Sequence, residues 1–153
     1  MSTSMISTVA DQERTLLREL SAGAAVSGGI GAGVWAWGAS QHRPAATAFG
    51  RQTFAWAAID GLIALAGRRG VASPPDDEDA AIARARRMRN VTAVNAVLDV
   101  AYVVGGLALS RWSRAPRATR VADGTAVAIQ GAFLLWLDTR HALLFRRLAR
   151  TAD

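Results

Sequence analysis

The sequence predicts an all-α protein whose four helices form a bundle that crosses a membrane. Three observations support this prediction. Four long apolar stretches occupy residues 20–39, 49–67, 91–109 and 121–140. All 18 basic residues are arginines, and they cluster between those stretches. None of the stretches shows the sustained alternation of apolar and polar residues that the strands of a membrane barrel require.

The first stretch, 20–39, has no charged residue over about 20 positions, which is enough to span the hydrocarbon core of a bilayer. Because Arg14 and Arg18 precede it, a cleaved signal peptide is the alternative. The stretch is longer than the apolar core of a signal peptide. Trp35 and Trp37 near its end are typical of the aromatic belt at a membrane interface. We therefore expect a helix that remains in the protein.

The region 68–90 follows the second stretch, 49–67, and is expected to be a loop in water. Pro74 and Pro75 stop any helix there. The four acids at 76–79 favour a new helix start, because negative charge is stabilised at a helix N-terminus. We expect the second half of this region to extend the third membrane helix into solvent.

Arginine counts predict which ends of the helices face the cytoplasm. The N-terminal arm, the region 68–90 and the C-terminal end hold 12 arginines, whereas the two other loops hold 6. Because cytoplasmic loops are enriched in arginine, both termini and the region 68–90 are expected in the cytoplasm. The lysine-free, alanine-rich composition is typical of a GC-rich bacterial genome. The expected location is therefore the bacterial inner membrane, with the lipid bilayer as the main partner.

A weak internal repeat would divide the chain into two parallel helix hairpins, as in some transporters. The repeat has an offset of 74 residues, and its few identities leave chance as the alternative. The aligned pairs are Gly50 with Gly124, Trp56 with Gln130, and Ala58 with Ala132.

Polar side chains inside the apolar stretches form the candidate site. Residues three, four or seven positions apart share one face of a helix. The third helix has such a face at Asn95, Asp99, Tyr102 and Gly106. The second has Gln52, Trp56, Asp60 and Ile63, and the fourth has Gln130, Leu134, Asp138 and His141. We expect these faces to turn inward. The candidate ligand or proton site is Asp60, Asn95, Asp99, Tyr102, Gln130, Asp138, Trp56 and Gln52.

The two acids near the middle of their helices, Asp60 and Asp99, carry the strongest functional signal. An acid at the bilayer centre costs about 2.5–3.5 kcal/mol on insertion scales. No arginine lies at a comparable depth, and two nearby acids in a low dielectric cannot easily both ionise. We therefore predict a proton shared between Asp60 and Asp99 if their helices are neighbours.

The alternative for the amides Asn95, Gln52 and Gln130 is helix packing, worth roughly 0.6 kcal/mol for each hydrogen bond. Asp138 and His141 are expected to reach headgroups and water near the interface. The first helix has two small-residue patterns, Gly29 with Gly33 and Ser27 with Gly31. We expect both patterns to pack the first helix within the bundle.

Composition also excludes several function classes. The absence of cysteine removes disulfides, thiolate metal sites and a cysteine nucleophile. His42 and His141 lie far apart in the sequence, so we expect no metal and no cofactor. Nucleic acid is not an expected partner, because the arginines flank each apolar stretch instead of forming a single basic stripe.

Three segments resemble a group of uncharacterised small four-helix bacterial integral membrane proteins. They are NAVLDVAYVVGG (95–106), GTAVAIQGAFLLWLD (124–138) and WAAIDGLIALAG (56–67). The resemblance covers about two thirds of the chain. The matching residues are Asn95, Asp99, Tyr102, Gly105, Gly106, Gln130, Gly131, Phe133 and Asp138. The group is expected to have Asn where this chain has Asp60. The resemblance implies a four-helix architecture and no particular activity.

Three functions fit the sequence. The first is an intramembrane site that binds or passes a small solute or proton. Because four helices are few for transport, this function would require a homodimer. The second is a non-catalytic subunit or assembly factor that binds another membrane protein. The third is a membrane-embedded enzyme acting on a lipid-like substrate, with one acid as general acid and another as base.

Overall fold

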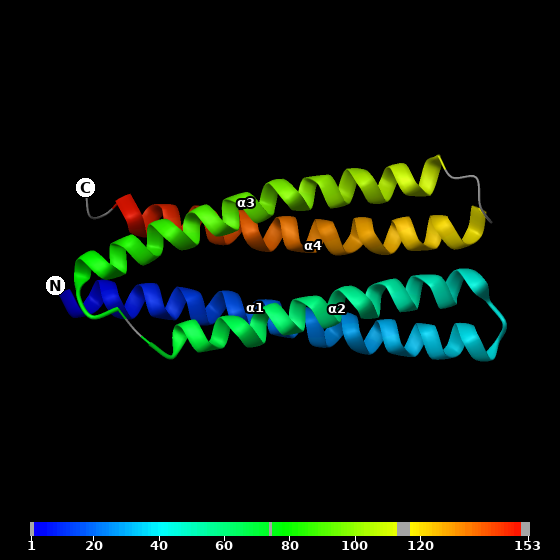
Figure 1. The fold of residues 1–153 in the computed structure, drawn as a ribbon, viewed down its shortest axis with the longest axis horizontal. Coiled ribbons are helices and arrows are strands. Elements are labelled where there is room, and N and C mark those ends of the chain that lie inside the picture. Colours follow the sequence, from blue (N-terminus) through cyan, green and yellow to red (C-terminus); the bar gives the residue numbers. More distant parts are fainter. Residues whose placement is uncertain (1, 74, 113–116, 151–153) are drawn as a thin grey trace.

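In the computed structural model the described residues are 2–73, 75–112 and 117–150, with side chains described from residue 5 onward. These residues form four long helices (Figure 1). The helices are α1 (Ser2–Ser40), α2 (Pro44–Val71), α3 (Glu78–Arg111) and α4 (Arg117–Arg150). The all-α, four-helix part of the prediction is confirmed.

The helices pair as two antiparallel hairpins, α1 with α2 and α3 with α4, which lie side by side along their length (Figure 1). The start of α1, the end of α4 and the α2–α3 connection share one end of the bundle. The hairpins meet mainly through α2 and α4. Within the described ranges, α2 and α3 have no pair of Cα atoms within 8 Å. A gap between these two backbones is therefore built into the fold.

The helices are longer than the apolar stretches that they contain. Only residues 72–77 separate α2 from α3, so most of the region 68–90, expected as a loop, is helical. The Asp77 side chain caps α3 by accepting a hydrogen bond from the backbone N–H of Ala80 at 2.7 Å. This confirms the predicted helix start among the acids. Pro74, the first of the expected helix stops, lies outside the described residues.

Glycine allows α1 and α2 to cross closely. A Cβ on Gly50 would lie 2.3 Å from the backbone N of Trp35 and 2.7 Å from the carbonyl O of Gly31. Of the two small-residue patterns in α1, the one that contains Gly31 therefore packs within the bundle. Gly29 and Gly33 do not, because a Cβ on either would meet nothing within 4 Å. The expectation that both patterns pack inside the bundle is therefore wrong for Gly29 with Gly33.

The α3–α4 hairpin has the same type of crossing. A Cβ on Gly124 would lie 2.4 Å from the carbonyl O of Gly106 and 2.8 Å from the backbone N of Ser110. Gly124 aligns with Gly50 at the predicted offset of 74 residues. Both glycines meet a carbonyl O and an N–H four residues later on the partner helix. The two hairpins therefore share their crossing geometry.

Half of the described buried apolar residues lie where the ends of α1, α3 and α4 extend past the apolar stretches. We call this part the arginine-covered end and define it as residues 2–19, 78–90 and 140–150. Its buried apolar residues are Val9, Ala10, Leu16, Ala81, Ala85, Phe145 and Ala149. Most of its arginines are exposed or only partly buried. This is the arrangement of an ordinary bundle in water, with an apolar core and a charged surface.

The rest of the bundle shows the opposite arrangement. Its exposed side chains include large apolar residues from all four helices, whereas three carboxyl groups and the amide of Gln130 are buried. The exposed apolar residues include Val26, Ile30, Leu62, Leu65, Val94, Val97, Val104, Leu107 and Ile129.

Among the described residues, α3 is the one helix whose length and composition suffice to cross a membrane. Glycine, tryptophan and charged or amide side chains make the other apolar stretches less hydrophobic. By this criterion the prediction of four membrane-spanning helices is not supported. Only 17% of the most apolar 18-residue part of α3 is buried. Its apolar surface is therefore not the covered core of this bundle.

Candidate functional site

Three carboxyl groups from three different helices are buried in the interior of the bundle. Asp60 on α2 is 2% exposed, Asp99 on α3 is 3% exposed and Asp138 on α4 is 8% exposed. Helical spacing turns each of them away from the apolar outer surface of its own helix. Burying a carboxyl group is costly unless it is hydrogen-bonded, so the partners of these three groups determine what the site can do.

Asp60 has its partner on α4. The side-chain amide of Gln130 donates a hydrogen bond to Oδ2 of Asp60. Gln130 is itself 4% exposed, so this contact crosses the main interface between the two hairpins inside the bundle. The hydrogen-bond partner of Asp60 is therefore Gln130 and not Asp99, with which a shared proton was predicted, because α2 packs on α4 and not on α3.

The carboxyl groups that pair with each other are Asp99 and Asp138. Their side chains are hydrogen-bonded, and the amide of Asn95 also bonds to Asp138. A hydrogen bond between two carboxyl groups requires a proton on one of them. Asp60 lies close enough to both acids for their charges to interact. The three acids and two amides thus form one connected polar cluster across α2, α3 and α4.

A cavity of about 320 Å³ adjoins this cluster in the gap between α2 and α3. All three aspartates line it, and so does Asn95. Apolar side chains from all four helices complete the walls. Those from α2 and α3 are Ile59, Ile63, Met88, Val91 and Leu98. Ile59, Ile63, Val91 and Leu98 are also exposed on the outside of the bundle. The cavity thus has a polar floor and an apolar rim between α2 and α3.

Two buried polar atoms of the cavity-lining residues have no hydrogen-bond partner. They are Oδ2 of Asp99, an acceptor, and the indole Nε1 of Trp56, a donor. The Trp56 ring meets the Tyr102 ring edge to face, with centroids 4.9 Å apart, and so bridges α2 and α3. Buried polar atoms in proteins are almost always paired. A ligand in this cavity would contact these groups.

The other predicted site residues are placed as follows. Tyr102 and Asn95 line the cavity although each is exposed on the outside of α3. Gln130 contacts Asp60 from α4 through its side-chain amide. Gln52 does not line the cavity. Gly106 serves the helix crossing with Gly124 and belongs to the packing of α3 on α4.

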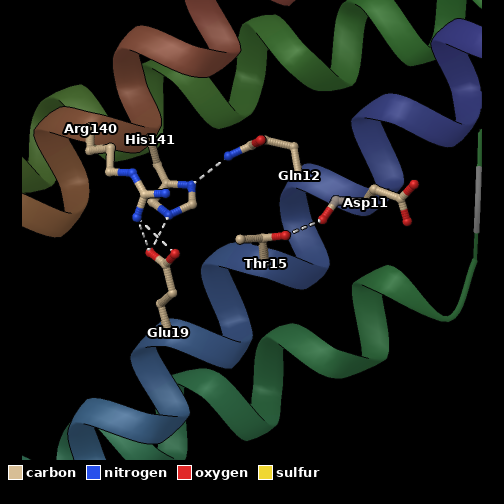
Figure 2. Close-up of polar contacts among 6 residues, drawn as sticks. All are labelled: Asp11, Gln12, Thr15, Glu19, Arg140 and His141. Carbon is tan, nitrogen blue, oxygen red and sulfur yellow. Dashed lines mark hydrogen bonds and ion pairs between the residues drawn. The ribbon is translucent and has the colours of Figure 1, made fainter.

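A second polar cluster joins α1 to α4 where the arginine-covered end begins (Figure 2). The fully buried imidazole of His141 lies between two α1 side chains. Its Nδ1 is 2.9 Å from the amide nitrogen of Gln12, and its Nε2 is 3.0 Å from Oε2 of Glu19. A neutral imidazole with the proton on Nε2 satisfies both contacts. The expectation that His141 and Asp138 reach headgroups and water is therefore wrong, since both are buried.

Glu19 is the acid of this second cluster. Arg140 donates from Nη1 to both of its carboxylate oxygens, at 2.7 and 2.8 Å. Burial acts to raise the pKa of Glu19, but the hydrogen bonds from His141 and Arg140 outweigh it and hold the pKa below the ordinary value of 4.5. Glu19 is therefore a carboxylate at neutral pH and ties α1 to α4.

Arg84 of α3 links three elements at the arginine-covered end. Its Nε donates to Oε1 of the buried Glu13 at 2.7 Å. Its Nη1 and Nη2 donate to the carbonyl oxygens of Ser73 and Gly70, each at 2.6 Å. These carbonyls follow or end α2 and have no partner within that helix. Arg84 thus fixes the α2–α3 connection against α1.

The second cluster and Arg84 were missed in the sequence, although a signal was present. Glu13, Leu16 and Leu20 recur at helical spacing before and into the first apolar stretch. That spacing indicates a helix with one buried face through residues 9–20. Across the described residues, no group of three His, Asp or Glu side chains is arranged to hold a metal ion.

The chain belongs to a family of unknown function, DUF6992, whose model matches residues 19–139. The match covers the predicted apolar stretches except residue 140, and it includes the whole polar cluster. No curated protein and no solved structure matches the chain.

Proposed function

We propose that this member of the DUF6992 family is a multi-pass membrane protein that binds a small molecule inside its bundle. The molecule enters sideways from the bilayer through the gap between α2 and α3, and its polar end meets the cluster of Asp60, Asp99 and Asp138. The sequence predicted a site that binds or passes a small solute or proton, and this proposal keeps the binding of a small molecule.

The surface of the bundle supports lipid as its surroundings. Large exposed apolar patches on a protein in water mark interaction sites or lead to aggregation. Here the exposed large apolar residues occur on all four helices, and apart from Leu143 they lie outside the arginine-covered end. A bilayer matches that surface, because the apolar stretches are as long as its hydrocarbon core, about 30 Å. The prediction of four crossings thus stays as part of this proposal.

Tryptophans lie where the two interfaces of such a bilayer would be. Trp35, Trp37 and Trp112 lie near the hairpin ends and are all exposed. Trp136 is exposed close to the opposite limit, where the guanidinium of Arg140 lies 5.5 Å from its ring centroid. Tryptophan is enriched at both membrane–water interfaces, and arginine extends toward headgroups.

The observation that carries the binding proposal is the cavity with its unpaired polar atoms. Polar residues that serve only to join helices would be expected to satisfy one another, as Asp60 and Gln130 do. Asp99 pairs with Asp138, but its buried Oδ2 receives no hydrogen bond from an amide, hydroxyl or basic group and lies beside an open volume of about 320 Å³. Small-molecule sites have volumes of roughly 300–1,000 Å³ and mostly apolar walls with a few polar groups. Binding requires only the groups that the cavity presents, so we do not extend the proposal to a reaction.

Photolabelling from the lipid phase tests this proposal. The protein is reconstituted in liposomes with trifluoromethylphenyldiazirine, a small apolar photoreactive probe, and labelled residues are mapped by peptide mass spectrometry. Leu137 is 1% exposed and lines the cavity, so label reaches it only through the cavity. We expect label on Leu137 in the native protein.

Two tryptophan variants at adjacent positions supply the control. Ile63→Trp adds volume at the rim of the cavity, whereas Leu62→Trp places the same side chain on the outer surface. We expect the first to abolish labelling of Leu137 and the second to leave it unchanged. Absence of label in the native protein, or equal labelling in both variants, would refute the proposed site.

A further inference from the structure

We infer that the ligand of this cavity is an organic cation: an ammonium group that contacts Asp99 and Asp138, joined to an apolar body no larger than about one aromatic ring. This inference rests on the proposed function and adds the chemical class of the ligand. It follows from the charge of the floor, the aromatic pair at its edge and the apolar rim.

The charge of the floor is one-sided. Three of the described residues that line the cavity are aspartates, and none is an arginine or a histidine. The amides of Gln130 and Asn95 donate to Asp60 and Asp138, which leaves Asp99 paired with the Asp138 carboxyl and without an amide or basic donor on Oδ2. A buried carboxylate needs an opposite charge or a proton. A positively charged ligand supplies the first, and it allows the acids to ionise without a basic side chain.

An anionic head is disfavoured at the same place, because like charges at short distance in a low dielectric repel strongly. The arginines that would attract an anion lie elsewhere. Arg84 is committed to Glu13 and to the end of α2, and Arg140 is committed to Glu19. The floor of the cavity therefore discriminates by sign.

Trp56 and Tyr102 add a second feature that favours a cation. Both line the cavity, and their rings meet edge to face at 4.9 Å. Indole and phenol rings attract ammonium groups within about 6 Å of their faces, and aromatic groups are a known means of recognising quaternary ammonium. The rings stand on the two helices that flank the gap, and each lies within about one helical turn of an aspartate of the floor, Trp56 of Asp60 and Tyr102 of Asp99.

The apolar rim determines the rest of the ligand. Ile59, Ile63 and Leu98 line the cavity and are also exposed on the outside of the bundle. A small apolar body would remain among these side chains while the ammonium group reaches the floor. A hydrophilic inorganic cation would bury none of this apolar surface and would have to give up its water without compensation.

The test compares two molecules of the same shape. Benzyltrimethylammonium carries a quaternary nitrogen where neopentylbenzene carries a neutral carbon. Each competes with the diazirine probe for labelling of Leu137 in liposomes, at equal measured concentrations in the bilayer. We expect the cation to displace the label at a concentration at least tenfold lower than the neutral molecule.

Matched variants assign the preference to the acids. Asp99→Asn and Asp138→Asn keep the side-chain shape and remove the charge, and each should reduce the preference for the cation at least tenfold. Asp123→Asn is the control, because Asp123 lies on α4 outside the cavity, 3.8 Å from Arg51. It should leave the preference unchanged. Labelling of Leu137 by the probe alone shows that each variant is folded.

Each outcome separates the two proposals. If Leu137 is labelled but both molecules compete equally, or if Asp99→Asn and Asp138→Asn keep the full preference, the cation inference is overturned and the binding site stands. The same holds if neither molecule competes for a site that the probe still labels. If the probe does not label Leu137 at all, the proposed function itself fails.

Discussion

Adjacent glycines of α3 give opposite predictions for one methyl group. A Cβ on Gly106 would lie 2.6 Å from the carbonyl O of Gly124 and 2.7 Å from the backbone N of Ala128. A Cβ on Gly105 would meet nothing within 4 Å. Gly106→Ala therefore forces α3 and α4 apart, whereas Gly105→Ala adds a methyl group to open space.

The magnitude follows from these distances. Ordinary van der Waals contact begins near 3.4 Å, so the helices must separate by about 0.8 Å at Gly106, and the obstacles are backbone atoms that cannot rotate away. Overpacking of this kind costs typically about 1–3 kcal/mol. Replacing glycine by alanine in a helix gains about 1 kcal/mol when nothing obstructs it. We expect Gly105→Ala to be neutral or stabilising and Gly106→Ala to be destabilising, with about 1–3 kcal/mol between them.

Unfolding of the reconstituted protein, followed by far-UV circular dichroism during titration with a denaturing detergent, measures the difference. Gly124→Ala should resemble Gly106→Ala, and Gly50→Ala should do so in the other hairpin, because each faces backbone atoms of its partner helix. Gly29→Ala should behave like Gly105→Ala. Equal stabilities for Gly105→Ala and Gly106→Ala would refute the crossing geometry.

Three further predictions concern the arginine-covered end and its boundary. Since the folded-state pKa of Glu19 is lowered, its contribution to stability is present above pH 4.5 and is lost as the pH falls through the lowered value; Glu19→Gln should flatten this part of the profile of melting temperature against pH. His141→Phe keeps a ring but leaves Gln12 without its partner and Glu19 with Arg140 alone, which should cost about 1–3 kcal/mol in the detergent titration, whereas Leu143→Ala on the exposed face should change stability by less than about 0.5 kcal/mol. Arg84→Ala leaves the buried Glu13 unpaired and should lower the free energy of unfolding by about 3–5 kcal/mol. An equal loss for the exposed control Arg87→Ala would contradict the role of Arg84 in fixing the α2–α3 connection.

Helical spacing was enough to predict which polar side chains share a face, and the structure places Asp60, Asp99 and Asp138 inside the bundle. Spacing within one helix contains no information about which helix lies opposite. The pairing of Asp60 with Gln130 follows from the packing of α2 on α4, and the pairing of Asp99 with Asp138 follows from the α3–α4 hairpin. The predicted Asp60–Asp99 proton depended on that missing information.

The glycines show a second limit of sequence patterns. Gly29 and Gly31 belong to the same kind of small-residue pattern, yet only Gly31 contacts α2. The choice depends on the rotation of α1 about its axis, and long-range packing sets this rotation. The same packing buries His141, whose position near the expected interface suggested contact with water.

Charged residues made the predicted first helix shorter than α1. Arg14, Arg18 and the acids among them interrupt the apolar stretch, so the membrane criterion places the start of the first span at residue 20, although the helix begins at Ser2. In water a helix needs only one apolar face, and residues 9–20 provide it. The helical spacing of Leu16 and Leu20 in this segment therefore indicates the arginine-covered end, which the long apolar stretches do not.

The central claim is that lipid surrounds the part of the bundle whose interior holds the acids. Because the chain has no cysteine, single cysteines can be labelled with a nitroxide without background. In liposomes, power-saturation electron paramagnetic resonance on Val97→Cys, whose native side chain is 71% exposed, should show high access to oxygen and low access to a water-soluble nickel chelate. Ala83→Cys, exposed on the arginine-covered end of the same helix, should show the reverse. Nickel access at position 97 equal to that at position 83 would mean that water surrounds both parts, and the membrane site would be contradicted.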